Sequence, residues 1–315
     1  MGKRTGDSVA PRLPMTGSLV SSVPRSLGAL APVGPLAFGC WRFTTASVRD
    51  ASELIEVALD LGMNLIDTAD VYGFDWSGRG FGACEELLGA VLAAQPSLRD
   101  RMVLASKGGI LPGVPYDQSD TYLRSACEAS MRRLGVDRID LYQIHRPDVF
   151  SHPAQVAATL ASLREEGKIG EVGVSNYTVG QTEALARYLP FALATTQPEM
   201  SAACLDPLRD GTLDNAMRAG YTPLAWSPLA GGRLMTGDGV RPELVDVLDA
   251  IAARECVDRA AVSVAFVLAH PSLPIAIVGT QQVHRLRTLV AALAVQLSRS
   301  DCYTIIEASE GVPLP

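Results

Sequence analysis

The 315-residue sequence predicts an α/β protein that folds as a single (β/α)8 barrel of the TIM type. From residue 35 onward, short apolar runs rich in β-branched residues alternate with longer segments of helical period, and eight runs of each kind are present. Successive strand ends lie about 34 residues apart, a spacing typical of strand–helix units. A doubly wound sheet is the second choice, but the first expected strand and its loop, PLAFGCWRF, lack the glycine-rich dinucleotide fingerprint.

Apolar segments define the expected strands, which cover residues 35–41, 63–69, 102–107, 139–145, 170–176, 193–199, 222–228 and 274–280. Segments of helical period lie between them, including residues 51–62, 84–94, 118–135, 154–168, 212–220 and 242–255. A glycine lies at or next to the C-terminal end of four of these segments, where a left-handed cap is expected: Gly62, Gly135, Gly167 and Gly220. The positions of these glycines therefore agree with the helix ends that the apolar periodicity predicts.

One long stretch, residues 260–284, carries no Asp, Glu, Lys or Arg. His270, Pro271 and Pro274 interrupt it, so its apolar parts are much shorter than the ~20 residues that a membrane span requires. It is interpreted as a buried helix, a turn and a short buried strand. We expect no association with a membrane.

The first 34 residues differ in composition from the remainder. They are rich in Ser, Pro and Gly and carry four basic side chains against one acidic one, whereas the whole chain has a net charge of −7. We expect residues 1–34 to form a loose or hairpin-like N-terminal segment and residues 35–315 to form the barrel. A targeting sequence is the less favoured interpretation of the basic segment.

Charge and cysteine usage exclude several classes of protein. The chain has 27 Lys and Arg against 34 Asp and Glu, a balance that argues against nucleic acid as a partner. The six cysteines occur singly, without the close spacings of disulfide or metal frameworks, which favours a reduced cytoplasmic protein. We expect no bound metal.

Ionisable residues close several of the apolar strands, at the end of a barrel where active sites lie. Asp67 ends the second expected strand with Tyr72 five residues later, Lys107 ends the third, and His145 ends the fourth. A buried ammonium and carboxylate need partners, so we expect Asp67 and Lys107 to pair. A neighbouring ammonium stabilises a phenolate, so we expect the pKa of Tyr72 to fall below the usual value of about 10. This set suits proton transfer to a developing alkoxide.

Other interpretations fit these residues less well. Each residue alone is compatible with a structural ion pair at the barrel rim. A glycosidase needs two carboxylates, for which Asp67 and Glu199 are the candidates. The four histidines are scattered over separate elements, and no GxSxG elbow is present, so metal hydrolases and serine hydrolases have no support.

Seven motifs resemble those of the aldo-keto reductases: DTADVY (67–72), ASK (105–107), LYQIHRPD (141–148), GVSNY (173–177), TQPE (196–199), WSPLAGGRL (226–234) and IVGT (277–280). They occur in order from about residue 35 to the C-terminus, and IHRPD and GGRL are most similar to the bacterial short-loop members. The resemblance implies a (β/α)8 barrel that binds NAD(P)H without a Rossmann domain. It also implies a tetrad of Asp67, Tyr72, Lys107 and His145, in which the tyrosine is the general acid, the lysine lowers its pKa, the aspartate pairs with the lysine and the histidine orients the carbonyl.

The resemblance further implies where the cofactor lies. The nicotinamide carboxamide is held by Ser175, Asn176 and Gln197, and the ring stacks on Trp226. The end of the first strand (Gly39, Cys40, Trp41) faces the cofactor, and the loop of Ser227, Leu229, Gly231, Gly232 and Arg233 approaches the pyrophosphate. Gly279, Thr280 and Arg285 match the adenosine end. Arg285 favours NADP(H) over NAD(H), because an arginine can bind a 2′-phosphate through charge-assisted hydrogen bonds. However, Gly279, Thr288 and Leu289 stand where many members of the family carry Lys, Glu and Asn.

The substrate wall is less well defined by the sequence. Phe74, Trp76 and Phe81 lie between glycines beside Tyr72, and with Trp41 they are candidates for the substrate wall, or else the loop folds onto the neighbouring helices. Arg146 and Asp148 either fix their loop or meet a polar substrate. We expect an NAD(P)H-dependent oxidoreductase that interconverts a carbonyl (aldehyde, ketone or sugar) and an alcohol, with Tyr72 as general acid/base. The alternative is a nicotinamide-binding, redox-sensing regulatory subunit on the same fold with slow or vestigial catalysis.

Overall fold

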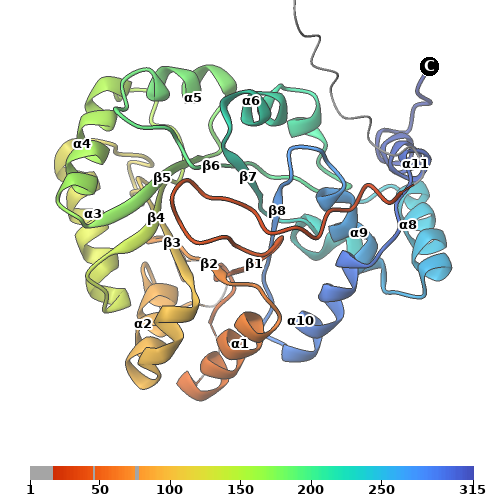
Figure 1. Ribbon diagram of the computed structural model, residues 1–315, viewed down its shortest axis with the longest axis horizontal. Helices are drawn as coiled ribbons and strands as arrows, with labels where there is room; N and C mark the ends of the chain where they lie inside the picture. The colour runs from red at the N-terminus through yellow and green to blue at the C-terminus, as the bar shows by residue number, and fades with distance from the viewer. Residues whose placement is uncertain (1–16, 45–46, 75–77) are drawn as a thin grey trace, which may run out of the picture.

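The computed structural model describes residues 17–44, 47–74 and 78–315 (Figure 1). Its eight parallel strands close into a barrel in sequence order, and the last strand pairs with the first. The strands are β1 Leu36–Gly39, β2 Leu65–Asp67, β3 Val103–Gly108, β4 Ile139–Ile144, β5 Ile169–Ser175, β6 Thr195–Gln197, β7 Thr222–Ala225 and β8 Ile275–Val278. The prediction of a single (β/α)8 barrel is confirmed.

Helices surround the barrel on its outside (Figure 1). They are α1 Val48–Asp60, α2 Ala83–Ala94, α3 Asp120–Leu134, α4 Pro153–Glu165, α5 Val179–Ala186, α6 Thr212–Ala219, α7 Arg233–Thr236, α8 Pro242–Glu255, α9 Arg259–Leu268, α10 Val283–Leu289 and α11 Arg299–Glu310. Short 3₁₀ helices are also present among the described residues: η1 Pro96–Arg101, η2 Asp206–Leu208, η3 Ala230–Gly232 and η4 Val290–Leu293. The long charge-free stretch forms α9, a turn and β8, as its sequence predicted.

Six of the strands are shorter than the apolar runs that predicted them, whereas β3 and β5 have the predicted length and are displaced by one residue. The run 63–69, for example, contributes only Leu65–Asp67 to the sheet, although Ala69 is fully buried beyond the strand. Apolar residues at the end of a strand can be buried below the loops without forming backbone hydrogen bonds to the neighbouring strand. Hydropathy therefore overestimates the length of a strand. The residues Glu199 and Trp226 likewise lie beyond their strands, joined by an isolated parallel bridge.

Two apolar cores hold the fold together. The larger lies between the sheet and the helices and contains Phe38, Ile66 and Leu104. The smaller fills the inside of the barrel with side chains that include Leu65 and Leu141. Alternation of side chains along each strand divides them between these two cores.

The N-terminal segment covers one end of the barrel. Arg25 and Val33 pair in an antiparallel bridge, and Leu27 and Val33 are fully buried in the inner core. The Asn64 side chain, just before β2, accepts a hydrogen bond from the backbone of Gly34 at 2.9 Å. Residues 25–34 therefore close the end of the barrel at which the strands begin; residues 1–16 lie outside the described ranges.

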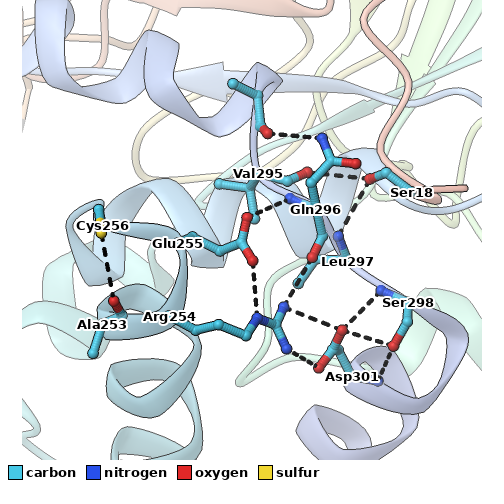
Figure 2. A network of polar contacts seen from close by, with 11 residues as sticks. Ser18, Ala253, Arg254, Glu255, Cys256, Val295, Gln296, Leu297, Ser298 and Asp301 are labelled. Carbon is cyan, nitrogen blue, oxygen red and sulfur yellow. Dashed lines mark hydrogen bonds and ion pairs between the residues drawn. The ribbon is translucent and has the colours of Figure 1, made fainter.

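The C-terminal helix α11 lies beside α8 and is fixed by a polar network (Figures 1 and 2). Arg254 of α8 donates to Asp301 Oδ1 of α11 at 2.7 Å and to the carbonyl of Gln296 at 2.9 Å. Ser18 joins the same network through the carbonyl of Val295. Both ends of the described chain are thus held on the side of the barrel where α8 lies. Within the described ranges, no helix combines the length and the hydropathy that crossing a membrane demands.

Strand register places polar side chains inside the barrel. Asp67 lies opposite Ala105, Lys107 lies opposite Gln143, and Ser175 lies opposite Gln197. These residues are at or near the carboxyl ends of β2 to β6. The polar groups of five strands therefore converge at one end of the barrel, opposite the end that residues 25–34 close.

Candidate active site

A buried ion pair lies at the centre of the site. Lys107 Nζ lies 2.6 Å from Asp67 Oδ2, and the two side chains are 0% and 2% exposed. The ammonium also donates to the backbone carbonyl of Thr68 at 2.9 Å. Burial alone would lower the pKa of Lys107, but Asp67 and Tyr72 outweigh it and leave the pKa raised. The expected pairing is present, and the lysine is a cation.

Tyr72 lies directly beside this lysine. Lys107 Nζ is 5.0 Å from the centroid of the Tyr72 ring. The His145 ring packs edge-on against the same tyrosine at 5.6 Å between centroids. The last residue of β2, the loop after it, the end of β3 and the residue after β4 therefore bring the four predicted catalytic residues together. The sequence also suggested the carboxylate pair Asp67 and Glu199, but the Asp67 carboxylate is engaged by Lys107.

The pKa of Tyr72 departs from the sequence-based expectation. Burial raises it to about 12, and Lys107 acts in the expected direction but does not overcome the loss of water. The prediction of a pKa below about 10 is therefore wrong for the cofactor-free protein. Tyr72 is a protonated phenol at neutral pH, the form that a general acid needs.

His145 is held as a neutral imidazole. Burial, together with the charges of Lys107 and Arg146, lowers its pKa well below the usual value. Its Nδ1 is buried and has no hydrogen-bond partner among the described residues. A neutral ring beside Tyr72 can donate a single hydrogen bond to a carbonyl oxygen but adds no charge to the site.

Two buried glutamines extend the ion pair into a network. Asp67 Oδ1 accepts from Gln197 Nε2 at 3.0 Å and from Gln143 Nε2 at 3.3 Å. Thr195 Oγ1 in turn donates to Gln143 Oε1 at 3.1 Å. Sequence reasoning placed Gln197 with the cofactor but missed Gln143 and Thr195. The only signal for Gln143 was a polar residue inside an apolar strand, two positions before His145.

The predicted nicotinamide residues form a second connected group at the ends of β5, β6 and β7. Trp226 Nε1 donates to Asn176 Oδ1 at 3.1 Å, and Asn176 Nδ2 donates to Ser175 Oγ at 3.0 Å. Ser175 Oγ donates to the carbonyl of Gln197 at 2.9 Å. Asn176 takes a positive φ of 58°, which turns its amide toward the indole. These hydrogen bonds hold the indole ring of Trp226 next to the side-chain amide of Asn176.

The loop after β7 turns sharply over the same end of the barrel. Ser227 and Ala230 have positive φ values of 52° and 50°, and Gly231 and Gly232 also lie in the left-handed region. Two strained non-glycine residues in one loop point to a backbone shaped for close approach of a ligand. Arg42, in the loop after β1, donates to the carbonyl of Gly231 at 2.7 Å, so the loops after β1 and β7 are joined. Leu229 is partly buried against the outer core, and Arg233 is exposed.

The ends of β1 and β8 meet closely. A Cβ on Gly279 would lie 2.8 Å from the carbonyl oxygen of Gly39, so a larger residue at 279 would have to displace backbone. Cys40 is fully buried, whereas Trp41 is 37% exposed. Thr280 Oγ1 accepts from the backbone of Gln282, and Arg285 is exposed on α10.

The candidate substrate wall is only partly described. Phe74 is 55% exposed. Phe74 and Phe81 line an outer groove of about 540 Å³ together with residues of α3. The Arg133 guanidinium of α3 lies 5.8 Å from the centre of the Phe81 ring, so Phe81 packs toward a helix. Trp76 lies outside the described residues.

Charged groups line the mouth beside His145. Burial raises the pKa of Glu199, and the charges of Arg233 and Arg146 oppose that rise. Asp148 accepts from the backbone of Phe150 and from Ser151 Oγ, so it fixes its own loop. Among the described residues, the guanidinium of Arg146 makes no hydrogen bond or ion pair, although its backbone carbonyl accepts from Gln118. The backbone of Arg146 is therefore fixed by Gln118, while its charged side chain has no hydrogen-bond partner among the described residues.

Comparison with known proteins gives consistent results. The model of the Aldo/keto reductase family matches residues 35–310. The chain is 49% identical over 286 residues to the 6-dehydroglucose reductase of Novosphingobium aromaticivorans, covering 90% of this chain and 94% of that protein. It is 37% identical to the oxidoreductase YdhF of Escherichia coli, covering 91% and 98%. The structure of a glycerol dehydrogenase from Gluconobacter oxydans superposes with a TM-score of 0.80 at 27% identity, covering 93% and 97%.

Proposed function

The chain belongs to the aldo/keto reductase family, and we propose that it is an NADP(H)-dependent oxidoreductase in which Tyr72 is the general acid/base for interconverting a carbonyl and an alcohol. The observation that carries the proposal is the contact of Tyr72 with both the buried Lys107 and the neutral His145. A phenol between a cation and a neutral donor suits protonation of a carbonyl oxygen.

The residues beside this set fit a nicotinamide. Trp226 is fixed by its hydrogen bond to Asn176, and the side chains of Ser175, Asn176 and Gln197 converge beside it. An aromatic face with neighbouring amides and a hydroxyl is suited to a planar ring that carries a carboxamide. When bound, the reduced cofactor supplies a hydride to the carbonyl carbon.

The protein's own groups handle the proton. Tyr72, protonated at neutral pH, donates its proton to the carbonyl oxygen as the oxygen gains negative charge. Neutral His145 donates a hydrogen bond to the same oxygen and orients it. Lys107 stabilises the phenolate that remains on Tyr72, and Asp67 keeps the lysine charged and in place. In alcohol oxidation the same phenolate accepts the proton.

Arg285 supports NADP(H) over NAD(H). It is exposed on α10, close in sequence to Thr280 after β8, where a 2′-phosphate can form charge-assisted hydrogen bonds with a guanidinium. The proposed preference depends on this one side chain, since Gly279 provides no second cation.

For the substrate we propose a sugar aldehyde of the 6-dehydroglucose type. The relative that is 49% identical is named for that substrate. The charge of Arg146 acts on His145, and Glu199 lies near Arg146. Both side chains can bind hydroxyl groups, which a polyhydroxylated substrate presents and a simple aldehyde does not.

The test is a pair of measurements on the purified protein. NADPH and NADH are titrated by quenching of tryptophan fluorescence, and nicotinamide absorbance is then followed with aldehydes, ketones and sugar aldehydes, including 6-dehydroglucose. We expect tighter binding of NADPH and the highest kcat/KM with the sugar aldehyde. No quenching by either cofactor would overturn the proposal, and binding with negligible turnover of every carbonyl would favour the redox-sensing regulatory subunit.

A further inference from the structure

We propose that Gln143 is a positioning residue that holds both the Asp67 carboxylate and the Gln197 amide in the orientation that the reaction needs. The inference rests on the proposed function of Tyr72. Gln143 is fully buried on β4, opposite Lys107 in register. Its amide joins three strands, because it contacts Asp67 of β2 and Thr195 of β6.

The Gln143 amide is held in one orientation. A threonine hydroxyl and a carboxylate lie at its two ends, and an ionised carboxylate can only accept a hydrogen bond. The amide nitrogen must therefore face Asp67, and the amide oxygen must face the Thr195 hydroxyl, as the structure has them. A flipped amide would place two acceptors against each other in a buried site, which is strongly unfavourable.

The Gln143 amide has room inside the barrel because the neighbouring residue on β5, Gly173, has no side chain. A Cβ on Gly173 would lie 1.9 Å from Thr195 Oγ1 and 3.1 Å from Gln143 Cγ. Gly173 therefore leaves the space in which Gln143 and Thr195 meet. An apolar side chain could have filled this interior with no polar groups to satisfy, so the network is a specific arrangement.

Gln143 acts on the ion pair through Asp67. The carboxylate has Lys107 on Oδ2 and two amide donors on Oδ1. Each donor stabilises the ionised carboxylate, and the ionised carboxylate keeps Lys107 an ammonium. The ammonium in turn stabilises the phenolate of Tyr72. The negative charge of Asp67 also raises the pKa of Tyr72, and the Gln143 donor disperses part of that charge. Loss of the donor should therefore make Tyr72 a weaker acid.

Gln143 also acts on the cofactor side through Gln197. Gln197 Nε2 lies 3.0 Å from Asp67 Oδ1 and 3.5 Å from Gln143 Oε1. Both amide hydrogens of Gln197 thus have acceptors inside the network. The carbonyl oxygen of its side chain is left to accept from the amide of a nicotinamide carboxamide. Gln143 therefore links the Asp67–Lys107 ion pair beside Tyr72 to Gln197, the residue proposed to bind the nicotinamide.

Gln143→Met tests the inference, since methionine is similar in length and has no donor. We measure the tyrosinate absorbance of the cofactor-free protein after a rapid jump to alkaline pH, with Tyr72→Phe versions as blanks. The midpoint for Tyr72, which burial already raises in the parent protein, should rise further, by about one pH unit. We also expect NADPH to bind about fivefold more weakly by fluorescence quenching, because Gln197 loses one of its two acceptors and is held by Asp67 alone.

Two further variants separate positioning from simple structural damage. Thr195→Val removes only the donor to Gln143 Oε1 and should shift both readouts in the same direction by less. Asn215→Leu deletes a buried amide outside the network, hydrogen-bonded to Tyr221, and should lower stability without moving either readout. Thr195→Val also keeps the test informative if Gln143→Met fails to fold.

The outcomes distinguish this inference from the proposed function. An unchanged Tyr72 midpoint in Gln143→Met, or in Thr195→Val if the first variant does not fold, overturns the role of Gln143, whatever the turnover. Equal effects of Asn215→Leu and Gln143→Met would reduce that role to packing. Failure of the parent protein to bind or oxidise any nicotinamide would instead overturn the proposed function, while the tyrosinate shift would still report on the network.

Discussion

Replacing Lys107 by methionine tests the ion pair and the acid together. The variant leaves the Asp67 carboxylate buried without its cation, and breaking a buried pair in this way costs about 3–5 kcal/mol of stability. It also removes a charge that lies 5.0 Å from the Tyr72 ring. At that separation and an effective dielectric constant of about 20, the interaction with a phenolate is about 3 kcal/mol, or about 2 pH units. We therefore expect a less stable protein whose Tyr72 is a much weaker acid.

The double variant Asp67→Asn with Lys107→Met provides the decisive comparison. The asparagine side chain introduced by Asp67→Asn keeps an acceptor for the two glutamines but carries no charge, so most of the lost stability should return. Turnover should not return, because Tyr72 still lacks its cation. Urea unfolding measures the stability, and kcat/KM for carbonyl reduction, expected to fall at least tenfold in both variants, measures the chemistry. If the double variant is as unstable as the single one, or if Lys107→Met retains full activity, the reasoning is refuted.

Three further outcomes are expected from the site. Because reduction needs the protonated form of Tyr72, whose pKa burial raises to about 12, kcat/KM for reduction should be flat through neutral pH and fall only as pH approaches that value, and a loss of reduction near pH 8 would contradict the assignment. Alcohol oxidation needs the phenolate and runs with the positively charged oxidised cofactor, so it should begin to rise at a lower pH. Arg285→Ala should weaken NADPH binding about tenfold and leave NADH nearly unchanged in fluorescence titrations; an equal loss for both would show that Arg285 does not bind the 2′-phosphate. Arg146→Ala should raise KM for a sugar aldehyde several-fold with little effect on a short aliphatic aldehyde in steady-state assays; equal effects on both would remove Arg146 from hydroxyl recognition.

The sequence was sufficient for the fold and for the residues that lie at strand ends. Asp67, Lys107 and His145 could be found because an ionisable residue at the end of an apolar strand is unusual and a barrel brings such ends together. Gln143 could not be found in this way. A neutral amide inside a strand carries little signal, and its partners Asp67 and Thr195 are 76 and 52 residues away in the chain. Only the strand register shows that they meet.

The acidity of Tyr72 shows a second limit of sequence reasoning. The motif indicates a lysine beside the tyrosine, and a cation lowers a phenol's pKa. It does not indicate how much water surrounds the ring, and burial proves to be the larger effect. The direction of the shift therefore depended on packing that only the three-dimensional structure supplies.

Under the proposed function, these two effects together explain how the site would respond to a nicotinamide cofactor. Asp67 balances the charge of Lys107, and His145 is neutral, so the ion pair and the imidazole add little net charge around Tyr72 and burial dominates its pKa. An oxidised nicotinamide beside Tyr72 would add a positive charge with no such counterpart, and in a poorly solvated site that charge acts strongly. Tyr72 should therefore hold its proton in the free protein and release it more readily beside the oxidised cofactor. In the proposed reaction, the proton affinity of Tyr72 would then follow the redox state of the cofactor, as reversible carbonyl reduction requires.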